Sequence, residues 1–199
     1  MKKPEKNAQI IRAATQEFLS KGLDAASMQN ISVLAEVSKR TLYKYYPTKD
    51  DLYNGLVDEI LDRVSNMLPL TYDSEIKISD QIEEIIEAKM KLTLDDDFLK
   101  ISKIVTGELL KKRTPTASQL ERFYQSESMF IKWLKEAQKD GKVTQEVSAN
   151  DIATQFHSFL KGQIYWPVLL GFVKKEDLDL VKIKNQTIKF FTTSFSREP

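Results

Sequence analysis

Apolar residues recur every three or four positions along most of the chain, which is the spacing of an α-helix with one buried face. The first such stretch runs from Asn7 to Lys21 and ends before Gly22, a residue free to adopt the left-handed conformation of a helix C-terminus. No stretch shows the strict alternation of apolar and polar residues that predicts a half-buried strand. The pattern therefore predicts an all-α protein with about nine helices.

Two short helices follow, each preceded by a serine. Ser27 is placed to cap a helix that runs through Ala35, and Ser38 is placed to cap the next one. The second helix ends before Pro47, since the residue before a proline is biased away from the helical conformation. Thr48 then caps a longer helix that reaches about Leu68. Two short helices joined by a turn, the second polar and basic, form the pattern of a helix-turn-helix.

The rest of the chain continues the helical spacing without repeats or low-complexity tracts. Five further helices are predicted: from Ser74 to Leu94, from Asp96 to Lys112, from Pro115 to Lys139, from Ala149 to Phe172 and from Asp177 to Phe195. Within the fourth of these, Pro167 is expected to kink or end the regular stretch.

The charge of the chain is uneven. The first 49 residues contain nine Lys or Arg and four Asp or Glu, whereas the whole chain has a net charge of only +1. A basic N-terminal quarter on a mildly acidic body fits a nucleic-acid-binding head. There is no cysteine, no apolar run at the start typical of a signal peptide, and no run of the length needed to span a membrane. These features predict a cytoplasmic protein.

The segment ASMQNISVLAEVSKRTLYKYYPTKDDL, from Ala26 to Leu52, resembles the helix-turn-helix of the TetR family of bacterial repressors, the TetR/AcrR type. The resemblance rests on the pattern of small, apolar and aromatic positions in this segment, including the pair Tyr45-Tyr46. It covers the first quarter of the chain, and the remainder is similar in length and helical character only. It implies a DNA-binding domain in residues 1–48, a connector helix in 49–68, and a ligand-binding and dimerisation domain in 69–199.

The segment departs from the family pattern at two positions. Glu36 stands where the family commonly has glycine, so its backbone is strained if the turn requires a positive φ. Arg40 stands where many members have glycine or a small residue, which adds a long cation and a means of changing operator preference.

Several side chains of this segment are predicted to contact DNA. Lys39, Arg40 and Thr41 face base edges or phosphates from the first turn of the recognition helix, and the tyrosine hydroxyls are placed to donate to phosphates. Tyr46 is either a DNA-facing or a core residue. The predicted DNA-binding residues are Gln29, Ser38, Lys39, Arg40, Thr41, Tyr43, Lys44, Tyr45 and Lys49.

The family resemblance implies that the C-terminal domain binds a small-molecule effector and forms a homodimer. The dimer would be made by the helices from Ala149 to Phe172 and from Asp177 to Phe195, with Gly162 allowing a partner backbone to approach closely. A dimer also places two recognition helices in successive major grooves. The candidate ligand-binding residues are Phe98, Ile101, Val105, Tyr124, Phe130, Trp133, Phe156 and Tyr165. For each of them an ordinary place in the core is the competing interpretation.

The sequence therefore predicts a DNA-binding transcriptional regulator, a repressor released from its operator by a small molecule. The alternatives are a helical enzyme and a helical adaptor without DNA binding. There is no phosphate-binding glycine loop, no HExxH and no G-x-S-x-G, so no enzymatic activity and no cofactor are expected. No metal is expected either, because His157 is the only histidine and the chain lacks cysteine.

Overall fold

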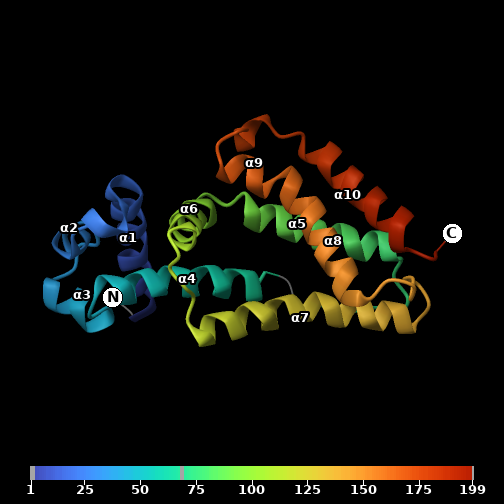
Figure 1. Ribbon diagram of the computed structural model, residues 1–199, viewed down its shortest axis with the longest axis horizontal. Helices are drawn as coiled ribbons and strands as arrows, with labels where there is room; N and C mark the ends of the chain where they lie inside the picture. The colour runs from blue at the N-terminus through green and yellow to red at the C-terminus, as the bar shows by residue number, and fades with distance from the viewer. Residues whose placement is uncertain (1–2, 68–69, 199) are drawn as a thin grey trace. The chain divides into compact units, whose positions relative to one another are not determined.

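The computed structural model describes residues 3–67 and 70–198, and its regular structure there is helical (Figure 1). Ten α-helices and one 3-10 helix are present in these ranges, and the only β-type pairing among them is an isolated antiparallel bridge between Val143 and Ser196. The predicted all-α class is confirmed. The predicted end of the connector helix, at Leu68 and Pro69, lies outside the described residues.

The chain divides into two compact units, Met1–Asp62 with Asp96–Gln119, and Arg63–Asp95 with Leu120–Pro199. The N-terminal unit contains α1 (Lys3–Ala25), α2 (Met28–Leu34), α3 (Lys39–Tyr45), most of α4 (Lys49–Ser65) and α6 (Asp96–Leu110). The C-terminal unit contains α5 (Ile78–Thr93), most of α7 (Ala117–Lys139), α8 (Ala149–Gln163), α9 (Tyr165–Leu169), the 3-10 helix η1 (Lys175–Asp177) and α10 (Leu180–Phe195). The functional division into head, connector and ligand-binding domain stays a prediction.

The core of the N-terminal unit gathers one apolar face from each of its helices. Ile10 of α1, Ile31 of α2, Leu42 of α3 and Leu52 of α4 are each completely buried in it. Ile101 of α6 joins the same cluster, and α6 packs against α1. The short α2 and α3 are thus stabilised by packing, because isolated helices of this length are not stable in water.

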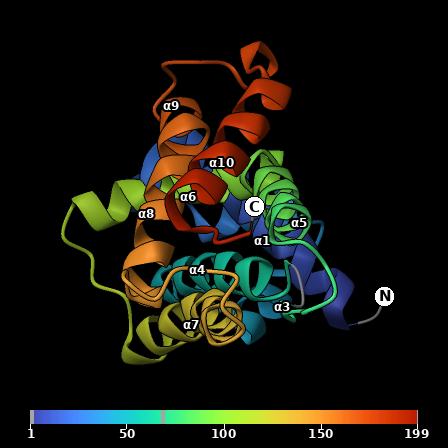
Figure 2. The same ribbon diagram turned by 90° about the vertical axis from the view of Figure 1, so that its right-hand side faces the viewer.

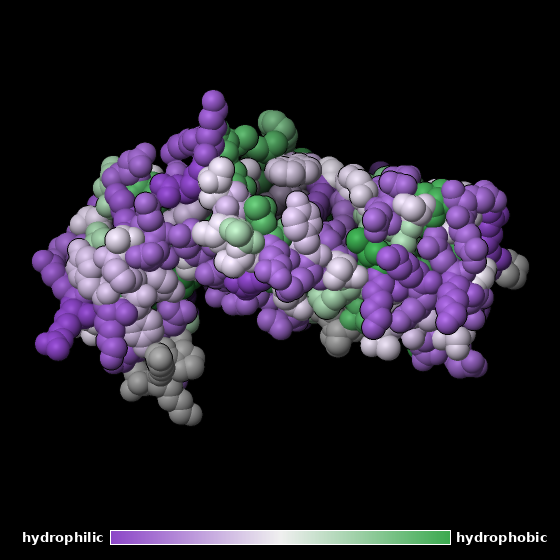
Figure 3. Space-filling view, turned by 60° about the horizontal axis from the view of Figure 1, so that its bottom comes forward, coloured by the Kyte–Doolittle hydropathy of each residue, from purple (hydrophilic) through white to green (hydrophobic). Residues whose placement is uncertain are grey.

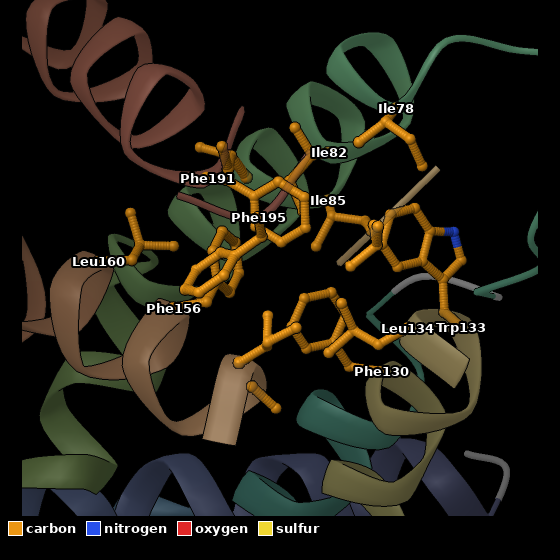
Figure 4. Close-up of a cluster of buried hydrophobic side chains, with 14 of the residues drawn as sticks. Ile78, Ile82, Ile85, Phe130, Trp133, Leu134, Phe156, Leu160, Phe191 and Phe195 are labelled. Carbon is orange, nitrogen blue, oxygen red and sulfur yellow. The ribbon is translucent and has the colours of Figure 1, made fainter. Parts of the chain in front are cut away.

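The core of the C-terminal unit is rich in aromatic side chains (Figure 4). Phe130 and Trp133 of α7 stack with ring centroids 5.8 Å apart, and Phe156 of α8 lies 5.0 Å from Phe130. Phe191 of α10 meets Phe156 edge to face at 5.8 Å. Figure 2 shows α10 running alongside α8 and α5, with which it packs. Offset and edge-to-face pairs of this kind stabilise a core beyond the area that they bury.

The C-terminal segment caps the first turn of α5, although the two are far apart in the sequence. Lys77, which precedes α5, provides no side-chain cap for the helix. Instead, the Glu198 carboxylate accepts a hydrogen bond of 2.8 Å from the backbone N–H of Ile78. A carboxylate at this end also interacts favourably with the helix dipole.

The predicted helix from Ala149 to Phe172 is interrupted close to Pro167, where a kink or an end was expected. It is two helices, α8 and α9, separated at Ile164. Pro167 accounts for the break, because it has no N–H to donate to the carbonyl of Gln163 and its ring crowds that carbonyl. The short α9 ends at Leu169 and is followed by Gly171 with φ 77°.

Other predicted helix starts are shifted as well. α5 begins at Ile78 rather than at Ser74, and α10 begins at Leu180, capped by Asp179, rather than at Asp177. α7 begins at Ala117 rather than at Pro115, because the Thr116 hydroxyl accepts from the N–H of Gln119 at 3.2 Å.

Candidate nucleic-acid interface

The turn between α2 and α3 is fixed by its own backbone hydrogen bonds. The N–H of Glu36 donates to the carbonyl of Val33, and the N–H of Val37 donates to that of Ser32, both at 3.0 Å. This is the Schellman arrangement, in which the residue after the C-cap takes a left-handed conformation. Glu36 has φ 52°, so the turn does require the positive φ on which the predicted strain of a non-glycine residue depends.

Glu36→Gly is expected to stabilise the protein by about 1 kcal/mol, since glycine lacks the Cβ that makes the left-handed conformation unfavourable. The measurement is urea unfolding followed by circular dichroism. Glu36→Ala is the matched control, because alanine keeps the Cβ while removing the carboxylate. Equal midpoints for the Gly and Ala variants would show that this backbone conformation carries no strain.

Ser38 caps α3, as predicted. Its hydroxyl accepts a hydrogen bond of 3.1 Å from the N–H of Thr41 and lies 2.8 Å from the Thr41 hydroxyl. Ser27 caps α2 in the same way, through the N–H of Asn30. These caps define where each short helix begins, and therefore which side chains of α3 face outward.

Tyr46 attaches the end of α3 to two other helices. Its hydroxyl donates a hydrogen bond of 2.8 Å to Oδ1 of Asn7 on α1. Its ring lies over Gly55 of α4 so closely that a Cβ at residue 55 would come within 2.6 Å of the ring. Burial raises the pKa of Tyr46, so the phenol remains protonated and able to donate at neutral pH. Of the two interpretations of Tyr46, these contacts favour the structural one.

The outward side of α3 is polar and basic. Lys39, Arg40 and Lys44 are exposed, and Tyr43 is 48% exposed. Figure 3 shows hydrophilic side chains projecting from the end of the unit that carries α2 and α3. Of the other predicted DNA-binding residues, Gln29 and Ser38 are exposed, whereas Thr41, Tyr45 and Lys49 are partly buried. The structure thus brings the predicted residues of α3 together on one short helix.

Lys49 has a structural contact that the sequence did not reveal. Its ammonium donates to the backbone carbonyl of Asp24 at 2.5 Å and to that of Ala26 at 3.2 Å. These bonds attach the first residue of α4 to the connection between α1 and α2. Thr48 and Asp51 complete this corner by capping each other's backbone N–H groups at 3.0 Å.

Glu17 was also missed by the sequence-based prediction. Its buried carboxylate accepts from Lys21 Nζ at 2.9 Å and from the N–H of Ser27 at 3.1 Å, and Asn30 Nδ2 lies 3.4 Å away. The hydrogen bond from Lys21 outweighs the opposing effect of burial and lowers the pKa of Glu17. Its position on the apolar face of α1, next to Phe18, was the available signal. The carboxylate links α1 to the start of α2.

Six of the eight predicted ligand-binding residues lie in two different hydrophobic clusters. Ile101 and Val105 belong to the cluster of the N-terminal unit, and Phe98, also on α6, is 7% exposed. Phe130, Trp133 and Phe156 are at most 2% exposed in the core of the C-terminal unit, and Tyr165 is partly buried against that core. Tyr124 is 67% exposed and touches Phe123. Their role in ligand binding stays a prediction.

The described residues contain neither a membrane-spanning helix nor a cluster of metal-binding side chains. None of the helices in residues 3–67 and 70–198 combines the length and the apolar character needed to cross a membrane. Within the same ranges, no three His, Cys, Asp or Glu side chains gather closely enough to hold a metal ion.

The chain matches two known protein families along most of its length. Residues 10–56 match the family described as bacterial regulatory proteins, tetR family. Residues 80–194 match the C-terminal domain of AefR-like transcriptional repressors.

Individual relatives agree with these matches. The HTH-type transcriptional regulator LuxR of Vibrio harveyi is 25% identical over 156 residues, which cover 77% of this chain and 74% of that protein. The HTH-type transcriptional activator FasR of Mycolicibacterium smegmatis is 30% identical over 87 residues, covering 42% and 40%. A TetR family transcriptional regulator from Pseudomonas syringae has a similar crystal structure, with a TM-score of 0.75, 27% identity and coverage of 99% of this chain and 100% of that one. From the helix-turn-helix geometry and these matches, the chain belongs to the TetR family of bacterial DNA-binding transcriptional regulators.

Proposed function

We propose that the protein is a homodimeric repressor that binds an operator in the cytoplasm and is released from it by a small-molecule ligand. The match of residues 80–194 to the C-terminal domain of a repressor supports repression rather than activation. Ligand binding would favour a conformation with lower operator affinity, which is a shift between two populations.

The observation that carries this proposal is the exposed basic side of α3. Ser38, Leu42 and Tyr46 fix the helix to its unit, while Lys39, Arg40 and Lys44 remain exposed. Arginine and lysine reach the acceptor atoms of guanine in the major groove and also pair with phosphates. We assign base contacts to the first turn of α3, and phosphate contacts to the predicted residues Gln29, Lys44, Tyr43, Tyr45 and Lys49.

Lys49 is proposed to contribute to DNA binding as well as to the fold. An ammonium group has three donors, and two of them are used by the carbonyls of Asp24 and Ala26. The third is available for a phosphate at the N-terminus of α4, where the helix dipole favours an anion.

The proposed dimer interface is formed by α8, α9 and α10, the helices that replace the two predicted ones. Five large apolar residues of α9, α10 and the connection between them are exposed in the single chain: Trp166, Leu170, Phe172, Leu180 and Val181. Gly162 of α8 has no atom of another segment within 4 Å of the place where a Cβ would lie. An exposed apolar set next to an open glycine suits a self-complementary helical interface.

Binding to duplex DNA tests the proposal. The wild-type protein is expected to retard a fragment of its own promoter, and the logarithm of affinity is expected to fall linearly with the logarithm of salt concentration. A promoter fragment with a scrambled operator serves as the control. Equal affinity for both fragments, or no retardation at low salt, would contradict a repressor function.

A further inference from the structure

Three charged or titratable side chains lie together at the edge of the C-terminal core, where Lys89 and Glu127 are partly buried. Lys89 continues the apolar stripe of α5 that contains Ile82 and Ile85, and Glu127 lies one turn before Phe130 on α7. His157 lies beside Phe156 on α8 and is 8% exposed. Charged residues on such faces are uncommon, because burying a charge is unfavourable unless it is paired.

His157 and Glu127 form a hydrogen-bonded pair at one edge of this group. Nδ1 of His157 lies 2.7 Å from the Glu127 carboxylate. Burial lowers the pKa of His157, although the hydrogen bond to Glu127 opposes this effect. The imidazole is therefore neutral at pH 7, with its proton on Nδ1 donated to Glu127. In this tautomer Nε2 is an acceptor.

The other edge lacks partners among the described residues. Nε2 of His157 is buried and has no hydrogen-bond partner there. The Lys89 ammonium lies 5.8 Å from the centroid of the Phe130 ring, and within the described ranges no hydrogen-bond acceptor or ion-pair partner reaches it. Burial lowers the pKa of Lys89 to about 8, and Glu127 is too distant to pair with it.

These two unsatisfied groups lie around the same ring. The His157 ring is 5.3 Å from Phe130, the residue beneath Lys89, and 5.7 Å from Phe156, which in turn lies 5.0 Å from Phe130. Figure 4 shows Phe130 and Phe156 facing one another in the core. A partly exposed ammonium without an ion-pair partner, a buried imidazole nitrogen that lacks a donor, and the aromatic rings beside them suit one small molecule that carries an anion and a donor.

We propose that Lys89, His157 and Phe130 bind an aromatic carboxylic acid that bears a hydroxyl group. The carboxylate pairs with the Lys89 ammonium, the hydroxyl donates to Nε2 of His157, and the aromatic body packs against Phe130. Glu127 positions the imidazole and is not a ligand contact. This inference rests on the proposed function, because it assigns the chemical class of the effector.

The test measures binding of 6-hydroxy-2-naphthoate through fluorescence of Trp133, whose ring stacks on Phe130. A Trp166→Phe background makes Trp133 the only tryptophan. The acid is expected to bind at least tenfold more tightly than its neutral amide. It is also expected to bind more tightly than 2-naphthoate, which lacks the hydroxyl.

Two variants test which residue is responsible for each of these two binding preferences. Lys89→Met is expected to abolish the preference for acid over amide while keeping the fold, since a partly buried cation is replaced by an apolar side chain of similar length. His157→Phe is expected to abolish the preference for the hydroxyl. Lys91→Met, an exposed position on the same helix, is the matched control and leaves both preferences unchanged.

The pH dependence provides a second readout. Binding of the carboxylate requires protonated Lys89, so affinity for the acid falls as pH rises through about 8, while affinity for the amide does not. The charged and titratable groups around Lys89 are Glu127, His157 and Lys161, and the pKa values of Glu127 and His157 are both lowered, away from this pH range. Equal binding of acid and amide by the wild type, or an unchanged preference in Lys89→Met, would overturn the site. DNA retardation without ligand, measured on protein that retains Trp166, tests the repressor function separately, because Trp166 belongs to the proposed dimer interface.

Discussion

Replacing Lys39, Arg40 and Lys44 together by alanine lowers the affinity for promoter DNA by about a hundredfold or more at 0.15 M salt. Each cation that neutralises a phosphate releases condensed counterions, and each contributes about 0.9 to the slope of log affinity against log salt. A dimer loses the phosphate contact of Lys44 on each of its two heads, so the slope is expected to become shallower by about two, and the lost base contacts of Lys39 and Arg40 lower the affinity further. The measurement is a titration of labelled duplex at several salt concentrations.

The fold is expected to survive this change, because the three side chains are exposed and alanine is a good helix former. A matched control removes the same charge elsewhere, with Lys135, Lys139 and Lys174 of the C-terminal unit replaced by alanine. That control is expected to change the salt slope by less than one unit, as distant exposed charges are screened. Similar losses in the two triple variants would mean that net charge, rather than α3, determines DNA binding.

The single variant Arg40→Ala separates affinity from sequence preference. If Arg40 reads guanine, its removal costs about 1–3 kcal/mol on the operator and much less on scrambled DNA. If it contacts only phosphate, both fragments lose affinity equally. The comparison shows whether the departure from the family pattern at this position affects operator choice.

The helix-turn-helix was predictable because its signals are local. The caps at Ser27, Ser38 and Thr48 each act within one turn, so their residue types reveal where helices begin. Whether residue 36 is glycine likewise matters only for the backbone conformation of that one residue. Because these signals are local, the predicted start of α7, Pro115, lies only two residues before the observed start, Ala117.

The contacts that position α3 were not predictable, because they join residues far apart in the sequence. Tyr46 reaches Asn7, and Lys49 reaches the carbonyl of Asp24. Periodicity identifies which side of a helix is buried, but it does not identify the partner that a polar side chain will meet.

The prediction of ligand-binding residues from the sequence was limited for a related reason. Phe130 and Phe156 were selected because they are aromatic and inward-facing, and such residues occur in cores and in binding sites alike. The more informative signal was Lys89, a cation on an apolar stripe, which a search for apolar spacing passes over. Only the structure relates it to His157 through their shared neighbour Phe130.

Gly162→Arg is expected to convert the dimer into a monomer at micromolar concentration. In the single chain nothing lies within 4 Å of the added Cβ, and residue 162 is exposed within α8. The substitution therefore leaves the isolated fold intact and favours the helix by up to about 1 kcal/mol. In the proposed interface the same position faces a partner backbone, where a long charged side chain prevents close approach. Sedimentation velocity or native mass spectrometry measures the change.

Loss of the dimer is also expected to weaken operator binding by about a hundredfold to ten-thousandfold, because the second head no longer binds at a high effective concentration. A dimer is needed to place two recognition helices about 34–36 Å apart in successive major grooves. Gly107→Arg is the matched control, since Gly107 is also a helical glycine with open space around its Cβ position, but on α6. That variant is expected to remain dimeric. A dimeric Gly162→Arg protein would place the interface away from this part of α8, whereas a monomer with unchanged operator affinity would show that DNA binding does not require the pair of heads.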